Sequence, residues 1–390
     1  MKKTLNIDWL SIFGIELVQD PVSAISLDSH IVTAETGSPL IPREYGIPLA
    51  LQESTSLDWL EADYGTKQFE RSGHIRNRIT HDKLAHVQIR KRQGIKLDPA
   101  ACIVKFANST LYSIKLDEIV RNVMTEACIE FKNISRLDLA LDFNYFHKNK
   151  YGEYQYDPEQ FIRDYMEGRI RRVIRNSANG CVHFQQDAKT GCFKYSAIHF
   201  GSKSSEVNCY LYNKTKELEE VKDKPHIRQA WEEAGLDLTK DVWRLEFSLS
   251  SKALKFRDDD GVFYDFTTMD TLSMRRCSDL FWSLVGHYFQ FVDPSDGVSN
   301  TTRKKRIELF DEHCSINRRS LNLHYNTGIA EKIFLKRLYQ LTKYPGIEPQ
   351  MVWNAQDIAD RITAYNPNLR EWFERKREQW EKGEDVRPMY

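Results

Sequence analysis

The segment SRLDLALDFN, residues 135–144, constrains the fold of this chain more than any other stretch. Its apolar residues recur at every second position, whereas Arg136, Asp138 and Asp142 occupy alternate positions. Because successive side chains of a β-strand point to opposite faces, this pattern predicts a strand with one buried and one polar face. A solvated edge strand explains the pattern, and so does a strand that carries a functional site. The choice depends on what the rest of the chain places beside it.

Two later segments alternate in the same way. In VWRLEFSLS the polar face carries Arg244 and Glu246. In EVNCYLYNK it carries Tyr210, Tyr212 and Lys214. If the three strands pair in one sheet, carboxylates converge beside a tyrosine. Clustered carboxylates repel one another, so such a site favours a hard cation, Mg²⁺ or Mn²⁺. A cation beside a phenol suits phosphoryl transfer, in which the tyrosine attacks a phosphodiester.

The spacing of the two aspartates limits how they bind a metal ion. Asp138 and Asp142 are four residues apart on one strand, which corresponds to about 13 Å at about 3.3 Å per residue. Both carboxylates therefore reach one ion only if the strand bends. We expect one of them to bind the cation together with Glu246, and the other to support it or to anchor a basic residue. Asp142 is slightly favoured as the ligand.

The order of the predicted elements indicates an α+β fold. An antiparallel sheet with flanking helices is expected first, because alternating segments and helical stripes are interspersed up to RDDDG at 257–261. A mainly helical C-terminal region follows. The sequence thus predicts an α+β domain over 1–260 and a helical region over 261–390. In the last predicted helix, one face suits an internal core better than a partner interface; it carries Leu369, Trp372, Phe373 and Trp380.

Charge and composition narrow the classes of protein. The 56 Lys and Arg residues balance 56 Asp and Glu residues, whereas nucleic-acid-binding domains are usually basic. Basic residues nevertheless cluster at 71–96, 168–175 and 303–306, which allows phosphate contacts. No apolar run approaches the about 20 residues of a membrane helix, and the start lacks an apolar signal core. The seven cysteines include no C-x-x-C pair. We expect a cytoplasmic protein with reduced thiols and no membrane partner.

Three motifs, in this order, resemble those of a known family. SRLDLALDF, AIHFGSKSSEVNCYLYNKTKE and VWRLEFSL resemble the replication initiation factor family (Rep-trans type) of rolling-circle plasmids and phages, over about residues 100–255. The resemblance implies an endonuclease that nicks one strand of double-stranded origin DNA. The tyrosine of the YNK motif, here Tyr212, would form a 5′-phosphotyrosine link, leave a free 3′-hydroxyl as primer, and later allow rejoining. A host helicase, a polymerase and a homodimer are also implied.

The resemblance assigns further residues to the site. By this resemblance, Asp138, Asp142 and Glu246 would be the metal ligands, and Lys214 would be a basic catalytic residue. The expected DNA contacts are Arg136, Arg244, Lys203, Arg303, Lys304, Lys305 and Arg306. The sequence departs from the family at two positions. Tyr210 replaces a basic residue and becomes the second candidate nucleophile, and His199 replaces an aromatic residue, where a packed strand histidine is expected.

Alternative functions remain open at this level. A mobilisation relaxase of the same family uses the same reaction. A DNA-binding regulator that retains the fold without catalysis is a second alternative, and an unrelated metal-dependent nuclease that releases a free 5′-phosphate is a third. None of the 11 histidines forms an H-x-H pair, which excludes the histidine-ligated site of other nicking enzymes. The chain also lacks a G-x-x-x-x-G-K-[ST] phosphate loop, so unwinding would need a separate helicase.

Overall fold

A computed structural model of the protein describes residues 2–17, 47–62, 64–98, 100–173, 181–186, 193–201, 205–221, 223–258, 260–299, 303–312, 316, 327–343, 348–364 and 367–381. The chain divides into two compact units, Met1–Arg319 and Ser320–Tyr390. Among the helices of these residues, none combines the length and the apolar character needed to cross a membrane.

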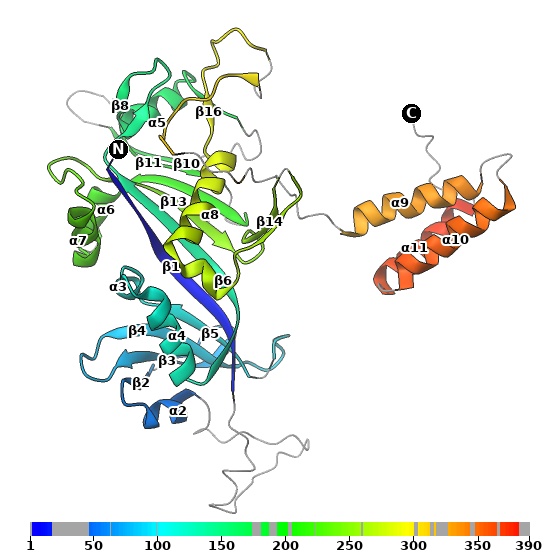
Figure 1. Ribbon diagram of the computed structural model, residues 1–390, viewed down its shortest axis with the longest axis horizontal. Helices are drawn as coiled ribbons and strands as arrows, with labels where there is room; N and C mark the ends of the chain where they lie inside the picture. Colours follow the sequence, from blue (N-terminus) through cyan, green and yellow to red (C-terminus); the bar gives the residue numbers. More distant parts are fainter. Residues whose placement is uncertain are drawn as a thin grey trace, which may run out of the picture. The chain divides into compact units, whose positions relative to one another are not determined.

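The first unit is built on one antiparallel sheet of ten strands (Figure 1). In spatial order the strands are β10 (Cys181–Gln186), β11 (Phe193–Phe200), β12 (Val207–Asn213), β13 (Trp243–Ser250), β6 (Ile129–Phe143), β1 (Lys3–Glu16), β5 (Ala101–Phe106), β4 (Lys83–Lys91), β3 (Phe69–Asn77) and β2 (Leu57–Glu61). The long strands β1 and β6 pair over almost their whole length. They join the β10–β13 side of the sheet to the β2–β5 side (Figure 1).

Helices and small hairpins surround this sheet. The helices are α2 (Ile47–Glu53), α3 (Asn108–Leu111), α4 (Leu116–Glu126), α5 (Pro158–Met166), α6 (Lys214–Glu220), α7 (Pro225–Glu233), the 3₁₀ helix η1 (Met269–Leu272) and α8 (Met274–Tyr288). The small strand pairs are β7 (Phe146–Lys148) with β8 (Tyr154–Tyr156), β9 (Arg171–Arg172) with β16 (Phe291–Val292), and β14 (Lys255–Arg257) with β15 (Phe263–Asp265). The α+β fold with an antiparallel sheet is therefore as predicted.

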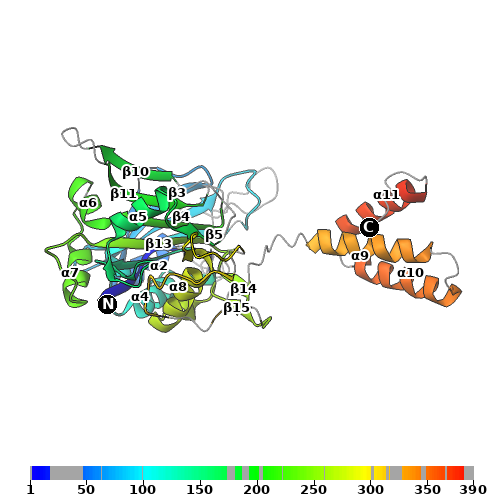
Figure 2. The same ribbon diagram turned by 90° about the horizontal axis from the view of Figure 1, so that it is seen from above.

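Helices cover the apolar face of the sheet. Leu137, Leu139 and Leu141 of β6 are buried, as their alternation predicts. The ring of Phe281 on α8 packs edge-on against Phe247 of β13, with 5.5 Å between ring centroids. Helix α4 contacts β6 and α5 contacts β11, and α4 and α8 lie on the same side of the sheet (Figures 1 and 2). The polar face of the central strands is the opposite one.

The boundary between the two units falls after Arg319, later than the boundary near residue 260 that the sequence predicts. The physical reason is α8, whose buried residues include Leu280, Phe281 and Leu284. This helix buries its apolar stripe on the sheet, so the chain after 260 continues the core of the first unit. The strands β14, β15 and β16 also occur in this stretch, where the sequence predicts mainly helix.

The second unit consists of three helices among its described residues: α9 (Thr327–Thr342), α10 (Pro349–Ala364) and α11 (Pro367–Glu381). Its apolar core contains Leu335, Leu338, Ala355, Ala359, Phe373 and Trp380. Phe373 and Trp380 thus belong to an internal core, as expected from their spacing. The side chains of Leu369 and Trp372 lie outside the described residues. The helical character predicted for the C-terminal region holds for this unit.

Candidate active site

The three segments singled out by their alternation are neighbours in the sheet. Strand β13 pairs with β12 on one side and with β6 on the other. In one row across these strands, Tyr212 lies opposite Arg244, which lies opposite Asp142. In the next row, Tyr210 lies opposite Glu246. Directly opposed residues share a face of the sheet, so the predicted convergence of carboxylates and tyrosines on one face is present.

The phenol of Tyr212 lies between a carboxylate and an ammonium group. Its phenol oxygen donates a hydrogen bond of 2.9 Å to Glu246 Oε2. The ammonium group of Lys214 lies 3.4 Å from the same oxygen. Lys214 is the first residue of α6, whose N-terminus is capped by the side chain of Asn213, and it is also paired with Glu217. The turn from β12 into α6 therefore fixes a cation directly behind the phenol.

Burial shifts the proton affinities of this group. Burial, reinforced by the charges of Asp8 and Asp138, raises the pKa of Glu246 to about 7. Burial and the Glu246 carboxylate raise the pKa of Tyr212 well above its ordinary value. Burial and the charge of Arg244 lower the pKa of Lys214. The phenol accordingly keeps its proton in the resting protein, and Glu246 is the adjacent acceptor with an affinity suited to proton transfer near neutral pH.

Arg244 does not have the DNA-contacting role that the sequence predicts. Its side chain is 0% exposed. The guanidinium group donates two hydrogen bonds of 2.6 and 2.7 Å to Asp142, one of 2.7 Å to Asp8 and one of 2.8 Å to Tyr112. A buried arginine with this set of partners cannot also reach a phosphate. It instead ties β13 to β6, to β1 and to the segment after α3.

The structure also corrects the preference for Asp142 as the metal ligand. Both of its oxygens accept hydrogen bonds from Arg244, and Oδ2 accepts a further one of 2.7 Å from the indole of Trp231 on α7. Its side chain is fully buried. Asp142 is thus the aspartate that anchors a basic residue. Asp138 is the one whose charge acts on Glu246, although both of its oxygens accept hydrogen bonds from Arg136, at 3.0 and 2.6 Å.

Asp8 is a site residue that sequence reasoning missed. Asp8 follows the buried Ile7 on strand β1, just before an irregularity in the pairing between Ile7 and Trp9, and its carboxylate accepts a hydrogen bond of 2.7 Å from Arg244. Although burial opposes its charge, the nearby Arg244 and Lys214 and a hydrogen bond from Asn108 hold the pKa of Asp8 well below its usual range. The signal in the sequence is the short NIDW segment, where an acidic residue interrupts an otherwise apolar strand.

Tyr210, the second candidate nucleophile, has different surroundings. Its ring stacks on His199 of β11, with centroids 4.2 Å apart and an interplanar angle of 4°. His199 Nε2 lies 3.3 Å from Oδ1 of Asn208. Burial and the Glu246 charge raise the pKa of Tyr210. His199 is packed within its strand, as expected. The hydrogen bond to Glu246 involves Tyr212 rather than Tyr210.

The remaining predicted DNA contacts differ in accessibility. Arg136 keeps 48% of its side chain exposed, and its guanidinium lies 4.7 Å from the centroid of the Trp9 ring. Arg303 and Lys305 are exposed. Lys203 lies outside the described residues.

Lys304 and Arg306 have structural surroundings. Lys304 is a correction, because only 8% of its side chain is exposed. Its ammonium group pairs with Asp296 and donates to the backbone carbonyl of Pro294 at 2.9 Å, so it holds its own loop together. Arg306 is half-buried and forms a β-bridge with Val292.

The carboxylates of the site suit a divalent cation that takes only one or two of its ligands from the protein. Among the described residues, no group of three or more His, Cys, Asp or Glu side chains is placed to hold a metal ion. Within the same part of the chain, Glu246 forms no ion pair, and the nearby charges of Asp8 and Asp138 raise its pKa. Mg²⁺ commonly binds through one or two carboxylates together with water and substrate phosphates. Glu246 and Asp138 are the carboxylates that could hold such an ion, and Asp138 would share its oxygens with Arg136.

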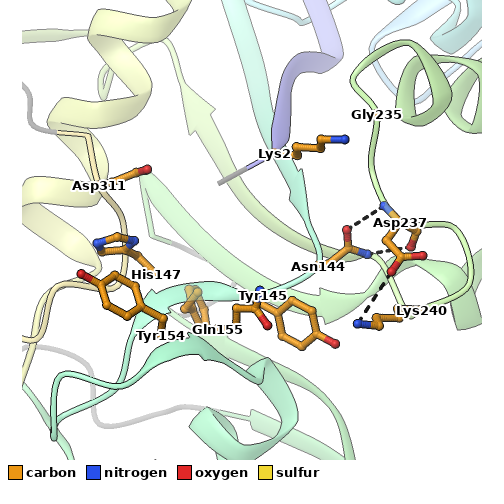
Figure 3. Close-up of a pocket in the computed structure, with 11 residues that line it drawn as sticks. Lys2, Asn144, Tyr145, His147, Tyr154, Gln155, Gly235, Asp237, Lys240 and Asp311 are labelled. Carbon is orange, nitrogen blue, oxygen red and sulfur yellow. Dashed lines mark hydrogen bonds and ion pairs between the residues drawn. The ribbon is translucent and has the colours of Figure 1, made fainter.

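A cavity of about 480 Å³ lies away from these residues, beyond the end of β6 (Figure 3). Its walls include Lys2, Tyr145 and Tyr154. On one side, the amide of Asn144 bonds to the backbone of Asp237, and Asp237 pairs with Lys240 at 3.7 Å (Figure 3). None of the predicted site residues lines this cavity.

The solved structures that match this chain include one replication protein. It is the rolling circle replication initiator protein from Geobacillus stearothermophilus. The two chains are 13% identical, the match covers 78% of this chain and 92% of the other, and the TM-score is 0.43. No protein-family model matches the sequence, and no curated protein matches it. A function must therefore be argued from the site itself.

Proposed function

We propose that the protein is a rolling-circle replication initiator that nicks one strand of its origin by tyrosine transesterification. The observation that carries the proposal is the hydrogen bond of 2.9 Å from Tyr212 to Glu246, with the Lys214 ammonium at 3.4 Å. A phenol with a proton acceptor on one side and a cation on the other is an activated nucleophile. The resemblance of three ordered motifs to those of the replication initiation factor family supports DNA as the substrate.

In the proposed reaction, Glu246 Oε2 accepts the phenol proton while the Tyr212 oxygen attacks the scissile phosphorus. The bond from phosphorus to the 3′-oxygen breaks, and that oxygen takes up a proton to become the primer 3′-hydroxyl. The 5′-phosphate stays bonded to Tyr212. Lys214 offsets negative charge on the phenol oxygen during the transfer. Attack by a 3′-hydroxyl on the phosphotyrosine reverses these steps and rejoins the strand without ATP.

A divalent cation completes the proposal. Mg²⁺ or Mn²⁺, held by Glu246 and Asp138, would polarise the phosphate and offset its charge. The remaining roles are those that the family resemblance implies: double-stranded origin DNA as the partner, a host helicase and polymerase acting afterwards, and a homodimer. Of the predicted DNA contacts, Arg136, Arg303 and Lys305 have the exposure that phosphate binding needs.

The decisive experiment is to trap the covalent product. The full-length protein is incubated with supercoiled DNA of its own element and Mn²⁺, and peptides linked to DNA are identified by mass spectrometry. We expect the adduct on Tyr212. Tyr212→Phe should lose nicking, and Tyr210→Phe should keep it. Nicking by Tyr212→Phe, or an adduct on Tyr210, contradicts the assignment.

The same assay separates the alternatives. Binding without any nicked product across Mg²⁺ and Mn²⁺ titrations indicates a non-catalytic regulator. A free 5′-phosphate without linked protein indicates an ordinary nuclease. Replication of an origin plasmid in cells without transfer machinery distinguishes an initiator from a mobilisation relaxase.

A further inference from the structure

Two stacked pairs of flat side chains flank Glu246 on the polar face of the sheet. On the β11–β12 side, Tyr210 stacks on His199 at 4.2 Å between ring centroids. On the β6–β1 side, the guanidinium group of Arg136 lies over the indole of Trp9 at 4.7 Å. Tyr210 lies directly opposite Glu246 in the strand pairing, and Trp9 lies directly opposite Asp138. Both stacks are therefore on the face that carries the candidate site.

Neither stack belongs to the apolar core. Trp9 is 38% exposed, and Arg136 has 48% of its side chain in solvent. Tyr210 and His199 are each partly exposed. His199 covers one face of the Tyr210 ring, and Glu246 lies opposite Tyr210 on β13. Aromatic rings are thus accessible on the polar face that carries the candidate site.

The charges of this face favour stacking as the mode of recognition. Glu246, Asp138 and Asp8 place carboxylates at its centre, and these repel the phosphates of a nucleic acid. Arg136, a half-exposed cation on this face, is already paired with Asp138. Flat π-faces remain, and both aromatic rings and guanidinium planes stack on unpaired bases. The face is therefore suited to bases rather than to a string of phosphates.

The separation of the stacks specifies the form of the DNA. In the sheet order β12-β13-β6-β1, Tyr210 and Trp9 are three interstrand steps and two residues along a strand apart, which corresponds to about 16 Å at about 4.8 Å per step and about 3.3 Å per residue. Neighbouring bases in a duplex stack about 3.4 Å apart. Bases bound on the two platforms would thus be unstacked from each other, with the backbone between them crossing Glu246, whose carboxylate accepts the hydrogen bond of Tyr212.

We propose that the Tyr210–His199 and Trp9–Arg136 stacks are platforms for unpaired bases on either side of the scissile phosphate. The inference rests on the proposed function for the identity of that phosphate. It gives Tyr210 a binding role in place of the nucleophilic one, and it makes single-stranded DNA the form that the site accepts. The segment around the nick must then be melted before Tyr212 can attack.

The test measures binding without chemistry. Full-length Tyr212→Phe protein in EDTA is titrated against a fluorescein-labelled oligo(dT) of about 16 nucleotides and against the duplex of the same length, with anisotropy as the readout. Stacking tolerates any base, so the origin sequence is not needed. In this background, Tyr210→Leu and Trp9→Leu keep apolar volume but remove the π-face. Each should weaken single-strand binding by about 5-fold to 100-fold and leave duplex binding within about 2-fold.

Matched variants separate stacking from loss of structure. Tyr210→Phe and Trp9→Phe keep a ring and should bind single strands nearly as the parent does. Tyr64→Leu and Trp353→Leu remove rings that are 71% and 70% exposed elsewhere in the chain, and should change nothing. The inference is overturned if the parent does not bind oligo(dT), if the leucine variants bind it like the parent, or if they lose duplex binding equally. Nicking by Tyr212→Phe contradicts the proposed function instead, so the two failures are distinguishable.

Discussion

The phenol oxygen of Tyr212 lies 2.9 Å from Glu246 Oε2 although the two residues are not opposite each other in the sheet. Tyr212 pairs with Arg244, and Glu246 lies two residues further along β13. Arg244, which lies opposite Tyr212, is buried in its bonds with Asp142 and Asp8, and the Tyr212 phenol donates diagonally to Glu246. Burial raises the pKa of both partners, so the folded protein resists ionisation at this point.

Replacing Glu246 with Gln should change how stability depends on pH. The folded pKa of Glu246 is raised from 4.5 to about 7. Its protonated form therefore favours folding, fully so below pH 4.5, and this contribution is lost as the pH rises through about 7. Between pH 4.5 and pH 8, the free energy of unfolding of the non-titrating Glu246→Gln variant should therefore rise by about 1–3 kcal/mol relative to that of the wild type. Urea unfolding of both proteins in EDTA at pH 4.5 and pH 8 measures this change. The same free-energy difference between variant and wild type at both pH values would contradict the prediction.

Divalent cations should stabilise the wild type through the same carboxylate. A ligand that binds only the folded state adds about 2.7 kcal/mol at a hundred times its Kd. We expect Mn²⁺ to raise the Tm of the wild type and not that of Glu246→Gln, because the variant lacks the charge that holds the ion. Glu61→Gln is the control, since Glu61 pairs with Arg71 on β2 and β3, and its shift should equal that of the wild type. Equal shifts in all three proteins would rule out a specific site.

The sequence allows the three central strands and their polar face to be predicted, because period-two alternation depends only on local side-chain geometry. The prediction from alternation fails in β1, where a bulge shifts the register with β6. Strict alternation groups Trp9 with Ile7 on the core face. The bulge between them places Trp9 opposite Asp138 instead, while Leu10 returns to the core opposite Leu137. A bulge depends on pairing with distant strands, so local pattern does not reveal it.

The same limit explains the exchange of roles between the two aspartates. In the sequence, Asp138 and Asp142 are equivalent, because each follows a leucine and both belong to the polar face of the strand. Only the register with β13 shows that Asp142 lies opposite Arg244, whereas Asp138 lies opposite Ser248. Arg244 therefore neutralises Asp142. Asp138 pairs instead with the half-exposed Arg136, and its charge acts on Glu246.

Removing one partner of the buried pair should destabilise the first unit strongly. Arg244→Ala leaves Asp142 as an uncompensated charge that is 0% exposed, and such changes cost about 3–5 kcal/mol. Arg244→Lys should recover little, because lysine cannot form the two parallel bonds to one carboxylate. Arg71→Ala breaks a more exposed pair and should cost less than about 1 kcal/mol. Urea unfolding of the three variants measures the difference, and similar losses for Arg244→Ala and Arg71→Ala would contradict the assigned role.

Truncation at two points should locate the end of the catalytic unit. A chain that ends at Arg319 keeps every element of the first unit, so it should unfold cooperatively and still form the covalent link to DNA. A chain that ends at residue 260 loses α8, whose Phe281 covers Phe247 on the apolar face of β13. It also loses the hydrogen bond of 2.8 Å from the backbone of Ile134 to Thr267. The shorter chain should expose apolar sheet and aggregate or bind a hydrophobic dye. Cooperative thermal unfolding of the shorter chain, measured by circular dichroism, would show that α8 is dispensable and that the boundary lies near residue 260 after all.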